Sequence, residues 1–253
     1  MGTTGGLDTV AVRMLQMKWR ERLYGQRGFV SAPSANTSGR PSPTLAEHVA
    51  EDLGGKIDMI LDGGAVEIGL ESTILDMTVT PPMILRPGAI TAEMFEEVIG
   101  KVDVDETLLV AESEKAPKAP GMKYRHYAPK AKLMIVEGDL REEIFAIRQL
   151  AYKAYKEGRK VGVIATTETL PFYKYGVVKN IGTRENEKTI ARNLYRVLRE
   201  FDEEDVEEIY SESFAAQRNR KSDYEIVWKK RRGIRVFRRR RSQNGRSTEE
   251  SYL

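Results

Sequence analysis

The sequence predicts an α/β protein in which a partial, twisted α/β domain with a phosphate-binding cleft is linked to a small Rossmann-like βαβ domain. Strand-like and helix-like segments alternate after residue 131, which is typical of βαβ units and a mainly parallel sheet. The stretch 102–130 is punctuated by Pro and Gly and is typical of a linker. We therefore expect one domain at 1–101 and a second at 131–253.

The first domain is expected to hold four short strands and two helices. Leu45, Val49 and Leu53 recur every four residues, which places them on one face of a helix. Thr91 precedes a second helical pattern that Gly100 ends. Apolar and β-branched runs between turn residues indicate the strands. The expected strands are 8–13, 59–63, 72–77 and 83–86, and the expected helices are 44–53 and 91–100.

The second domain repeats a strand–helix pattern. Its expected strands are 132–137, 160–166, 176–181 and 206–210, and its expected helices are 141–157 and 187–201. The chain carries no G-x-G-x-x-G loop, so a dinucleotide site is not supported. Residues 215–253 are atypical, because apolar periodicity ends there and runs of Arg begin.

The loop 31–44, S-A-P-S-A-N-T-S-G-R-P-S-P-T, is the most informative segment of the chain. It combines hydroxyl side chains, one amide and three prolines with no acidic residue, and no apolar periodicity runs through it. Its prolines restrict the backbone, and its hydroxyl and amide groups supply short-range donors. Such a loop suits the oxygens of a polyanion, with Arg40 as a charge partner. The alternative is a surface turn rich in Ser and Pro.

Composition excludes several kinds of site. The chain has no cysteine, which rules out disulfides and thiolate metal ligands and favours a reducing compartment. Its two histidines, His48 and His126, make a histidine-based metal site improbable. We find neither a signal-peptide pattern nor an apolar run of membrane-spanning length, so we expect a cytoplasmic protein with no membrane partner.

The net charge of +3 hides an uneven distribution. Residues 218–241 contain twelve Lys and Arg against two acidic residues, whereas the rest of the chain has 29 basic and 36 acidic residues. A basic run of this kind suggests tRNA or membrane phosphates. Aromatic residues are sparse in it, so tRNA binding by this segment is the weaker interpretation.

Five ordered motifs resemble one family, the two-domain L-threonylcarbamoyladenylate synthases. They are G-L-D-T-V-A-V-R-M at 6–14, the loop at 31–44, G-L-E-S-T-I-L-D at 69–76, I-L-R-P-G-A-I at 84–90 and P-G-M-K-Y-R-H-Y-A-P at 120–129. The resemblance implies condensation of L-threonine, bicarbonate and ATP to threonylcarbamoyl-adenylate and pyrophosphate. Mg²⁺ would enter on the ATP phosphates. A downstream tRNA threonylcarbamoyl transferase would then use the product.

The resemblance also implies which residues bind substrates, and no covalent nucleophile is expected. Without the family resemblance, we would interpret Thr9 and Arg13 as ordinary strand residues and the Ser72 hydroxyl as structural. Arg86 would make a surface ion pair of little energetic value. The implied ATP contacts are Thr9, Asn36, Thr44, Arg86, His126 and Tyr127, and the implied threonine contacts are Arg13, Ser34 and Ser72.

His126 and Tyr127 lie in the predicted linker. The resemblance implies that this linker folds over the cleft as a lid. Closing a lid would exclude water from a reactive mixed anhydride. The alternative is that these aromatic side chains simply pack the linker onto the first domain.

The chain also departs from the family pattern. The family has a longer region before the first motif, with a basic segment ending in Pro-Leu, so we expect a truncated and weakly active or inactive chain. Residues 15–29 and 215–253 do not continue the family pattern of the segments around them. When codons that could encode these residues are read in another frame, they give the helices and glycine turns that the family has at these places. We therefore expect shifted frames there. An error-free gene sequence that encodes the printed residues would reject this hypothesis.

Two rival functions are compatible with parts of the sequence. One is a non-catalytic module of the same fold that binds double-stranded RNA or tRNA in its basic cleft. The other is a carbamoyl-transfer module of hydrogenase maturation, which is disfavoured because that class places this domain among zinc-finger-like cysteines and the chain has none. Titration with ATP and threonine, compared with short RNA, separates the first rival from the synthase.

Overall fold

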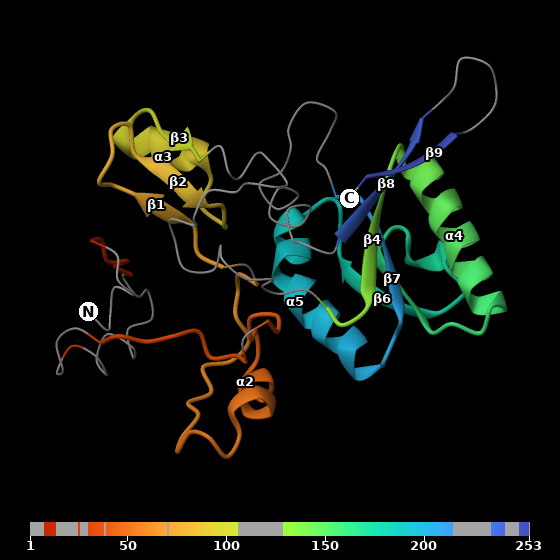
Figure 1. Ribbon diagram of the computed structural model, residues 1–253, viewed down its shortest axis with the longest axis horizontal. Coiled ribbons are helices and arrows are strands. Elements are labelled where there is room, and N and C mark those ends of the chain that lie inside the picture. Colours follow the sequence, from red (N-terminus) through yellow and green to blue (C-terminus); the bar gives the residue numbers. More distant parts are fainter. Residues whose placement is uncertain are drawn as a thin grey trace. The chain divides into compact units, whose positions relative to one another are not determined.

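The computed structural model describes residues 8–13, 25, 30–37, 39–69, 71–105 and 129–214, together with two strands at 234–240 and 248–252 (Figure 1). The chain divides into two compact units, residues 1–35 and 36–253. His126 and Tyr127 lie outside the described residues, as do most of residues 15–29.

The strand expected at 8–13 in the first unit is wrong. These residues have no regular structure, and the side chains of Val10 and Val12 are exposed. A strand needs a neighbour that accepts and donates its backbone hydrogen bonds. The described residues of this unit contain no strand, so a β-branched pattern alone does not make one.

In the second unit, helix α2 (Ala46–Leu53) comes first and is followed by a small three-stranded sheet. Strands β1 (Ile74–Asp76) and β2 (Met83–Arg86) pair antiparallel, and β3 (Asp103–Val104) lies parallel to β2. These elements confirm the expected strands 72–77 and 83–86, while β3 falls within the stretch expected to be a linker.

Helix α3 (Ala92–Ile99) confirms the helix expected at 91–100. The Thr91 hydroxyl caps it by accepting a hydrogen bond from the N–H of Met94 at 3.3 Å. Gly100 follows its last turn with φ of 78°, in the left-handed region that favours glycine.

The short strand expected at 59–63 is also wrong. Met59 is 72% exposed and Leu61 is 55% exposed, and no residue of this stretch is in a strand. An apolar run of this length becomes a buried strand only beside a sheet edge that accepts it. No strand among the described residues pairs with residues 59–63.

The C-terminal part of the unit is a six-stranded sheet in the order β6-β5-β7-β4-β8-β9 (Figure 1). All neighbouring pairs are parallel except β8 and β9. This confirms the expected βαβ pattern. The elements are β4 (Lys132–Glu137), α4 (Leu140–Lys156), β5 (Val161–Thr166), the 3-10 helix η2 (Leu170–Phe172), β6 (Val177–Gly182), α5 (Glu187–Glu203), β7 (Glu208–Glu212), β8 (Ile234–Arg240) and β9 (Thr248–Tyr252).

Helices α4 and α5 cover opposite faces of this sheet (Figure 1). Side chains of a strand alternate between faces, and Ile164 packs with α5 whereas its neighbour Val163 packs with α4. All six residues of β5 are buried, as expected of a central parallel strand. A Cβ at Gly162 would lie 2.6 Å from Cε1 of Phe201, so the strand accepts α5 only with glycine there.

The atypical stretch 215–253 contributes two strands to the sheet. β8 pairs in parallel with β4, with Leu133 opposite Ile234, and β9 pairs antiparallel with β8. Two segments of this stretch therefore extend the sheet beyond β4.

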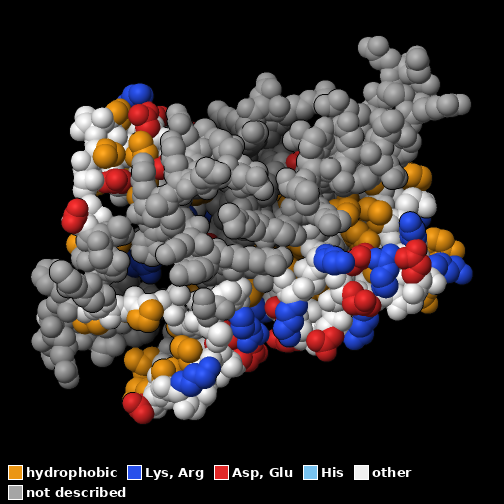
Figure 2. All heavy atoms as spheres, in the orientation of Figure 1, with side chains coloured by type: hydrophobic (Ala, Val, Ile, Leu, Met, Phe, Trp, Pro, Cys, Tyr) orange, Lys and Arg blue, Asp and Glu red, His pale blue; other side chains and the backbone are white. Residues whose placement is uncertain are grey.

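Charges of both signs are interspersed on the described surface that faces the viewer in Figure 2. Ion pairs such as Lys179–Glu200, at 3.4 Å, join neighbouring elements of the second unit. Mixed charges of this kind give weak long-range fields. Within the described residues, no helix combines the length and apolar character that crossing a bilayer requires.

Replacing Ile147 with Ala should lower the free energy of unfolding by about 2–5 kcal/mol, because the fully buried side chain leaves a cavity between α4 and the sheet. Arg148→Ala, at the next and exposed position of the same helix, is the matched control and should change it by less than about 0.5 kcal/mol. Urea unfolding followed by circular dichroism measures both. Equal effects of the two substitutions would contradict the packing described.

Candidate functional site

The loop 36–44 closes on itself through the side chain of Asn36. Its Nδ2 donates to the carbonyl oxygens of Thr37 at 3.0 Å and Arg40 at 3.2 Å, and the Arg40 N–H donates to the Thr37 carbonyl at 3.1 Å. Gly39 has φ of 91°, which a residue with a side chain rarely adopts. The Oδ1 of Asn36 is buried and has no hydrogen-bond partner among the described residues. The loop is thus rigid and retains an unused acceptor.

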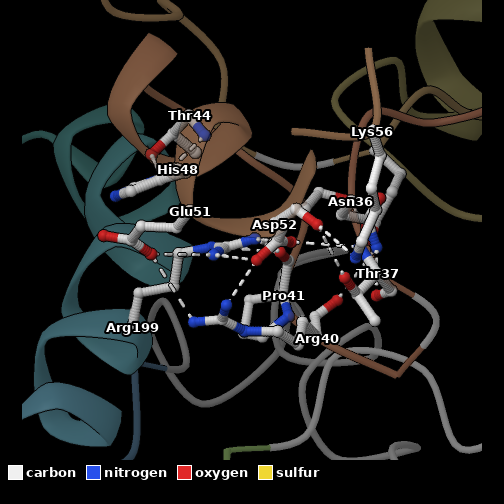
Figure 3. A network of polar contacts seen from close by, with 12 residues as sticks. Asn36, Thr37, Arg40, Pro41, Thr44, His48, Glu51, Asp52, Lys56 and Arg199 are labelled. Carbon is white, nitrogen blue, oxygen red and sulfur yellow. Dashed lines mark hydrogen bonds and ion pairs between the residues drawn. The ribbon is translucent and has the colours of Figure 1, made fainter. Parts of the chain in front are cut away.

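Asp52 of α2 holds this loop in place (Figure 3). One carboxylate oxygen accepts the backbone N–H of Thr37 at 3.1 Å, and the other accepts Nη1 of Arg40. The carbonyl of Asp52 accepts the Thr37 hydroxyl at 3.3 Å and Nζ of Lys56 at 3.1 Å. Each end of the turn is therefore tied to the same aspartate.

Arg199 of α5 completes the network from the C-terminal sheet (Figure 3). It is fully buried, and its Nη2 lies 2.9 Å from Oδ2 of Asp52 and 2.6 Å from the carbonyl oxygen of Pro41. Glu51 lies 3.6 Å from its Nη1. Burial opposes ionisation of Asp52, but hydrogen bonds from Arg199 and Thr37 prevail and lower its pKa. Asp52 is thus a buried carboxylate that stays ionised.

Thr44 and His48 lie on the same buried face of this region as Asp52. Both are 5% exposed, and the Thr44 N–H donates to Nδ1 of His48 at 3.1 Å. Burial, followed by the positive charge of Arg199, lowers the pKa of His48, so its ring is neutral. Leu45 and Val49, expected on the buried face of the helix, are only half-buried.

The motif around Glu71 meets both the loop and α5. Glu71 Oε1 accepts the hydroxyl of Ser42 at 3.4 Å, and Oε2 accepts the hydroxyl of Tyr195. The next residue, Ser72, offers its carbonyl oxygen to Nε and Nη2 of Arg86 at 3.1 and 2.8 Å. The structure therefore brings together Ser72 and Arg86, two of the predicted site residues.

Comparison with known proteins decides the family. A family model described as the C-terminal domain of threonylcarbamoyl-AMP synthase matches residues 90–222, more than half of the chain. The chain belongs to the threonylcarbamoyl-AMP synthase family. A second model, described as telomere recombination, matches residues 2–88. The resemblance carried by the five motifs is confirmed.

Known members of the threonylcarbamoyl-AMP synthase family are closely similar. The Bacillus subtilis enzyme is 46% identical over 212 residues, which cover 83% of this chain and 60% of that protein. The Pyrococcus abyssi enzyme is 46% identical over 210 residues with the same coverage. A crystal structure of P. abyssi Sua5 complexed with L-threonine has a TM-score of 0.78 at 41% identity, covering 91% of this chain and 65% of that one. The chain spans about 60% of the length of these curated relatives.

The remaining residues predicted from the family resemblance fall into two groups. Thr9, Arg13 and Ser34 are exposed residues of the first unit. His126 and Tyr127 are outside the described residues. Among the described residues, no group of three or more His, Asp or Glu could hold a metal ion.

Sequence reasoning missed Asp52, Arg199 and Tyr195. A signal existed for Asp52, because Thr44, His48 and Asp52 recur every four residues, and His48 and Asp52 form a polar face of α2. Arg199 carried a similar signal, since it interrupts the apolar surface of α5 directly after Leu198. A charged residue on an apolar face requires a partner. Here that partner is Asp52 of α2, together with the Pro41 carbonyl of the motif at 31–44.

A second buried polar cluster lies where strands β4 and β7 end. Glu212 accepts the hydroxyl of Tyr173 at 2.7 Å and Nη2 of Arg184 at 2.6 Å. Glu143 accepts the N–H of Gly138 at 3.3 Å and lies 3.6 Å from Arg184. Burial raises the pKa of Glu143 to about 8; Arg184 opposes this, and the charge of Glu212 adds to it. Glu143 is therefore protonated in the folded protein at neutral pH.

Replacing Glu143 with Gln should stabilise the protein at pH 7 by on the order of 2–3 kcal/mol relative to wild type. The folded-state pKa lies above its ordinary value of 4.5, so wild type loses stability as the pH rises from about 4.5 towards 8. The neutral amide removes this loss. Urea unfolding of both proteins between pH 5 and pH 8 measures it, and a difference that does not grow with pH would contradict the assignment.

Proposed function

We propose that this chain forms threonylcarbamoyl-AMP and pyrophosphate from L-threonine, bicarbonate and ATP, for threonylcarbamoyladenosine modification of tRNA. The observation that carries the proposal is the contact between two family motifs, in which the Ser42 hydroxyl lies 3.4 Å from Oε1 of Glu71. This contact sets the polar loop 36–44 beside Ser72 and Arg86. Family membership supports the same reaction.

Threonine recognition rests on the relative solved with L-threonine, which is 41% identical to this chain. We assign threonine contacts to Arg13, Ser34 and Ser72. A guanidinium pairs with a carboxylate through two parallel hydrogen bonds, which suits Arg13 to the carboxylate of an amino acid. Hydroxyl groups can both donate and accept, which suits Ser34 and Ser72 to the remaining polar groups.

ATP recognition is assigned to Thr9, Asn36, Thr44 and Arg86, with His126 and Tyr127 covering the bound nucleotide. Two of the five N–H donors of Arg86 bind the Ser72 carbonyl, which fixes the guanidinium and leaves donors for phosphate oxygens. Asn36 is held by its own turn and keeps a free acceptor. The N–H of Thr44 donates to His48, and this hydrogen bond fixes Thr44 at the end of the proposed ATP-binding loop.

The reaction needs positioning and charge stabilisation from the chain. The threonine amine and bicarbonate give a carbamate and release water; a carbamate oxygen then bonds to the α-phosphorus of ATP. The bond from that phosphorus to the bridging oxygen breaks, and pyrophosphate leaves with the electron pair. Donors such as Arg86 stabilise the charge that develops on phosphate oxygens.

Mg²⁺ would enter with ATP and be held mainly by its phosphates. The described residues around the loop fit this role, because they supply donors for phosphate oxygens, while the carboxylate of Asp52 is already occupied by Thr37, Arg40 and Arg199. Bound Mg²⁺ would neutralise charge on the leaving pyrophosphate.

The proposed partners follow from the product. Threonylcarbamoyl-AMP is a reactive mixed anhydride, so a downstream tRNA threonylcarbamoyl transferase should consume it in the cytoplasm. Direct tRNA binding through the basic run 218–241 is the weaker part of the proposal, since aromatic residues are sparse in this run.

Arg86→Ala should weaken ATP binding about tenfold or more, because one charge-assisted contact is worth about 1.5–3 kcal/mol. Isothermal titration calorimetry with L-threonine present and no added bicarbonate measures this, and Arg148→Ala is the control. Pyrophosphate should form only when all three substrates are present. A folded chain that binds short RNA and shows neither ATP binding nor pyrophosphate release would favour the non-catalytic RNA-binding module instead.

A further inference from the structure

One face of α5 contacts segments of the candidate site that lie far away in the sequence. Tyr195 donates to Glu71, and Arg199, one turn later, binds Asp52 and the carbonyl of Pro41. Residues four apart on a helix project from the same face. The helix therefore presents two polar side chains, side by side, to the two motifs that hold Asn36 and Ser72.

The same face makes closer contacts at both ends. A Cβ at Gly69 would overlap the backbone carbonyls of Ala191 and Arg192, so the start of the G-L-E-S-T motif lies directly against α5. At the other end, Asp202 accepts the N–H of Lys130 at 2.8 Å, and Lys130 is the last residue of the predicted linker. Loop, motif and linker end thus share one supporting helix.

The Arg199 contacts are too specific for general packing. Its side chain is completely buried, and its donors reach Oδ1 and Oδ2 of Asp52 as well as the Pro41 carbonyl. Asp52 in turn holds the N–H of Thr37 and the side chain of Arg40. Removing the guanidinium would leave a buried carboxylate with fewer donors and free the loop on one side.

We propose that Arg199 and Tyr195, from the C-terminal domain, are positioning residues of the ATP and threonine site. Arg199 fixes the loop that carries Asn36 through Asp52 and Pro41, and Tyr195 fixes Ser72 through Glu71. Neither side chain needs to touch a substrate. This inference rests on the function proposed above and assigns the C-terminal domain a part in it.

Hydrogen–deuterium exchange of the free chain tests the positioning directly. Arg199→Met should speed exchange at least tenfold in peptides covering 36–44 and leave peptides of the central strand β5 unchanged. Tyr195→Phe should act in the same way on peptides covering 71–76. Arg196→Ala is the matched control, because Arg196 lies on α5 and its ion pair is with Glu200, on the same helix. Unchanged exchange in 36–44 would overturn the inference.

ATP titration then connects positioning to function. Arg199→Met should raise the dissociation constant for ATP at least tenfold, Tyr195→Phe about threefold, and Arg196→Ala less than twofold. Faster loop exchange with unchanged ATP affinity would show a merely structural role and overturn the proposal. Wild type that fails to bind ATP would instead overturn the proposed function.

Arg199→Lys covers the case in which Arg199→Met does not fold. Lysine keeps the positive charge beside Asp52, but it lacks the planar fork with which Arg199 binds both carboxylate oxygens of Asp52 and donates twice to the Pro41 carbonyl. It should fold, retain the exchange rates of β5, and still raise the dissociation constant for ATP at least threefold. Wild-type affinity in this variant would contradict the requirement for a planar guanidinium.

Discussion

Arg199 and Asp52 form an ion pair from which water is excluded, since both side chains are fully buried. Losing one partner of such a pair costs about 3–5 kcal/mol, because the other charge stays buried without compensation. The pair therefore ties α2 and α5 to one arrangement. Asp52 also holds Thr37 and Arg40 of the turn at Asn36, and Arg199 also binds the Pro41 carbonyl. Burial, followed by the charge of Arg199, lowers the pKa of His48.

The buried carboxyl groups of the two polar clusters have opposite protonation states. Around Asp52, several donors outweigh burial and keep the carboxylate ionised, which suits a fixed link between elements. Around Glu143, burial outweighs the single nearby guanidinium and the carboxyl group takes up a proton. The negative charge of Glu212 adds to the effect of burial at Glu143, whereas the positive charges of Arg199 and Arg40 oppose it at Asp52.

The helices and parallel strands of the C-terminal domain were predictable, because their signals are local: a period of 3.6 for α4 and α5, and apolar runs for β4 and β5. The strands expected at 8–13 and 59–63 failed, since a strand depends on a partner that no local pattern reveals. The same holds for the site. Motifs predicted Ser72 and Arg86 as site residues, whereas the link from Asp52 to Arg199 joins residues 147 positions apart.

That separation bears on how the protein is made. Synthesis runs from the N-terminus, and domains fold as they emerge. The loop 36–44 leaves the ribosome long before α5, so Asp52 cannot meet Arg199 until the C-terminal sheet has begun to form. Contacts between such distant residues are also slow to form, because a long loop must close first. A nascent chain stopped before α5 would carry the whole polar loop, yet without the helix that holds it in shape.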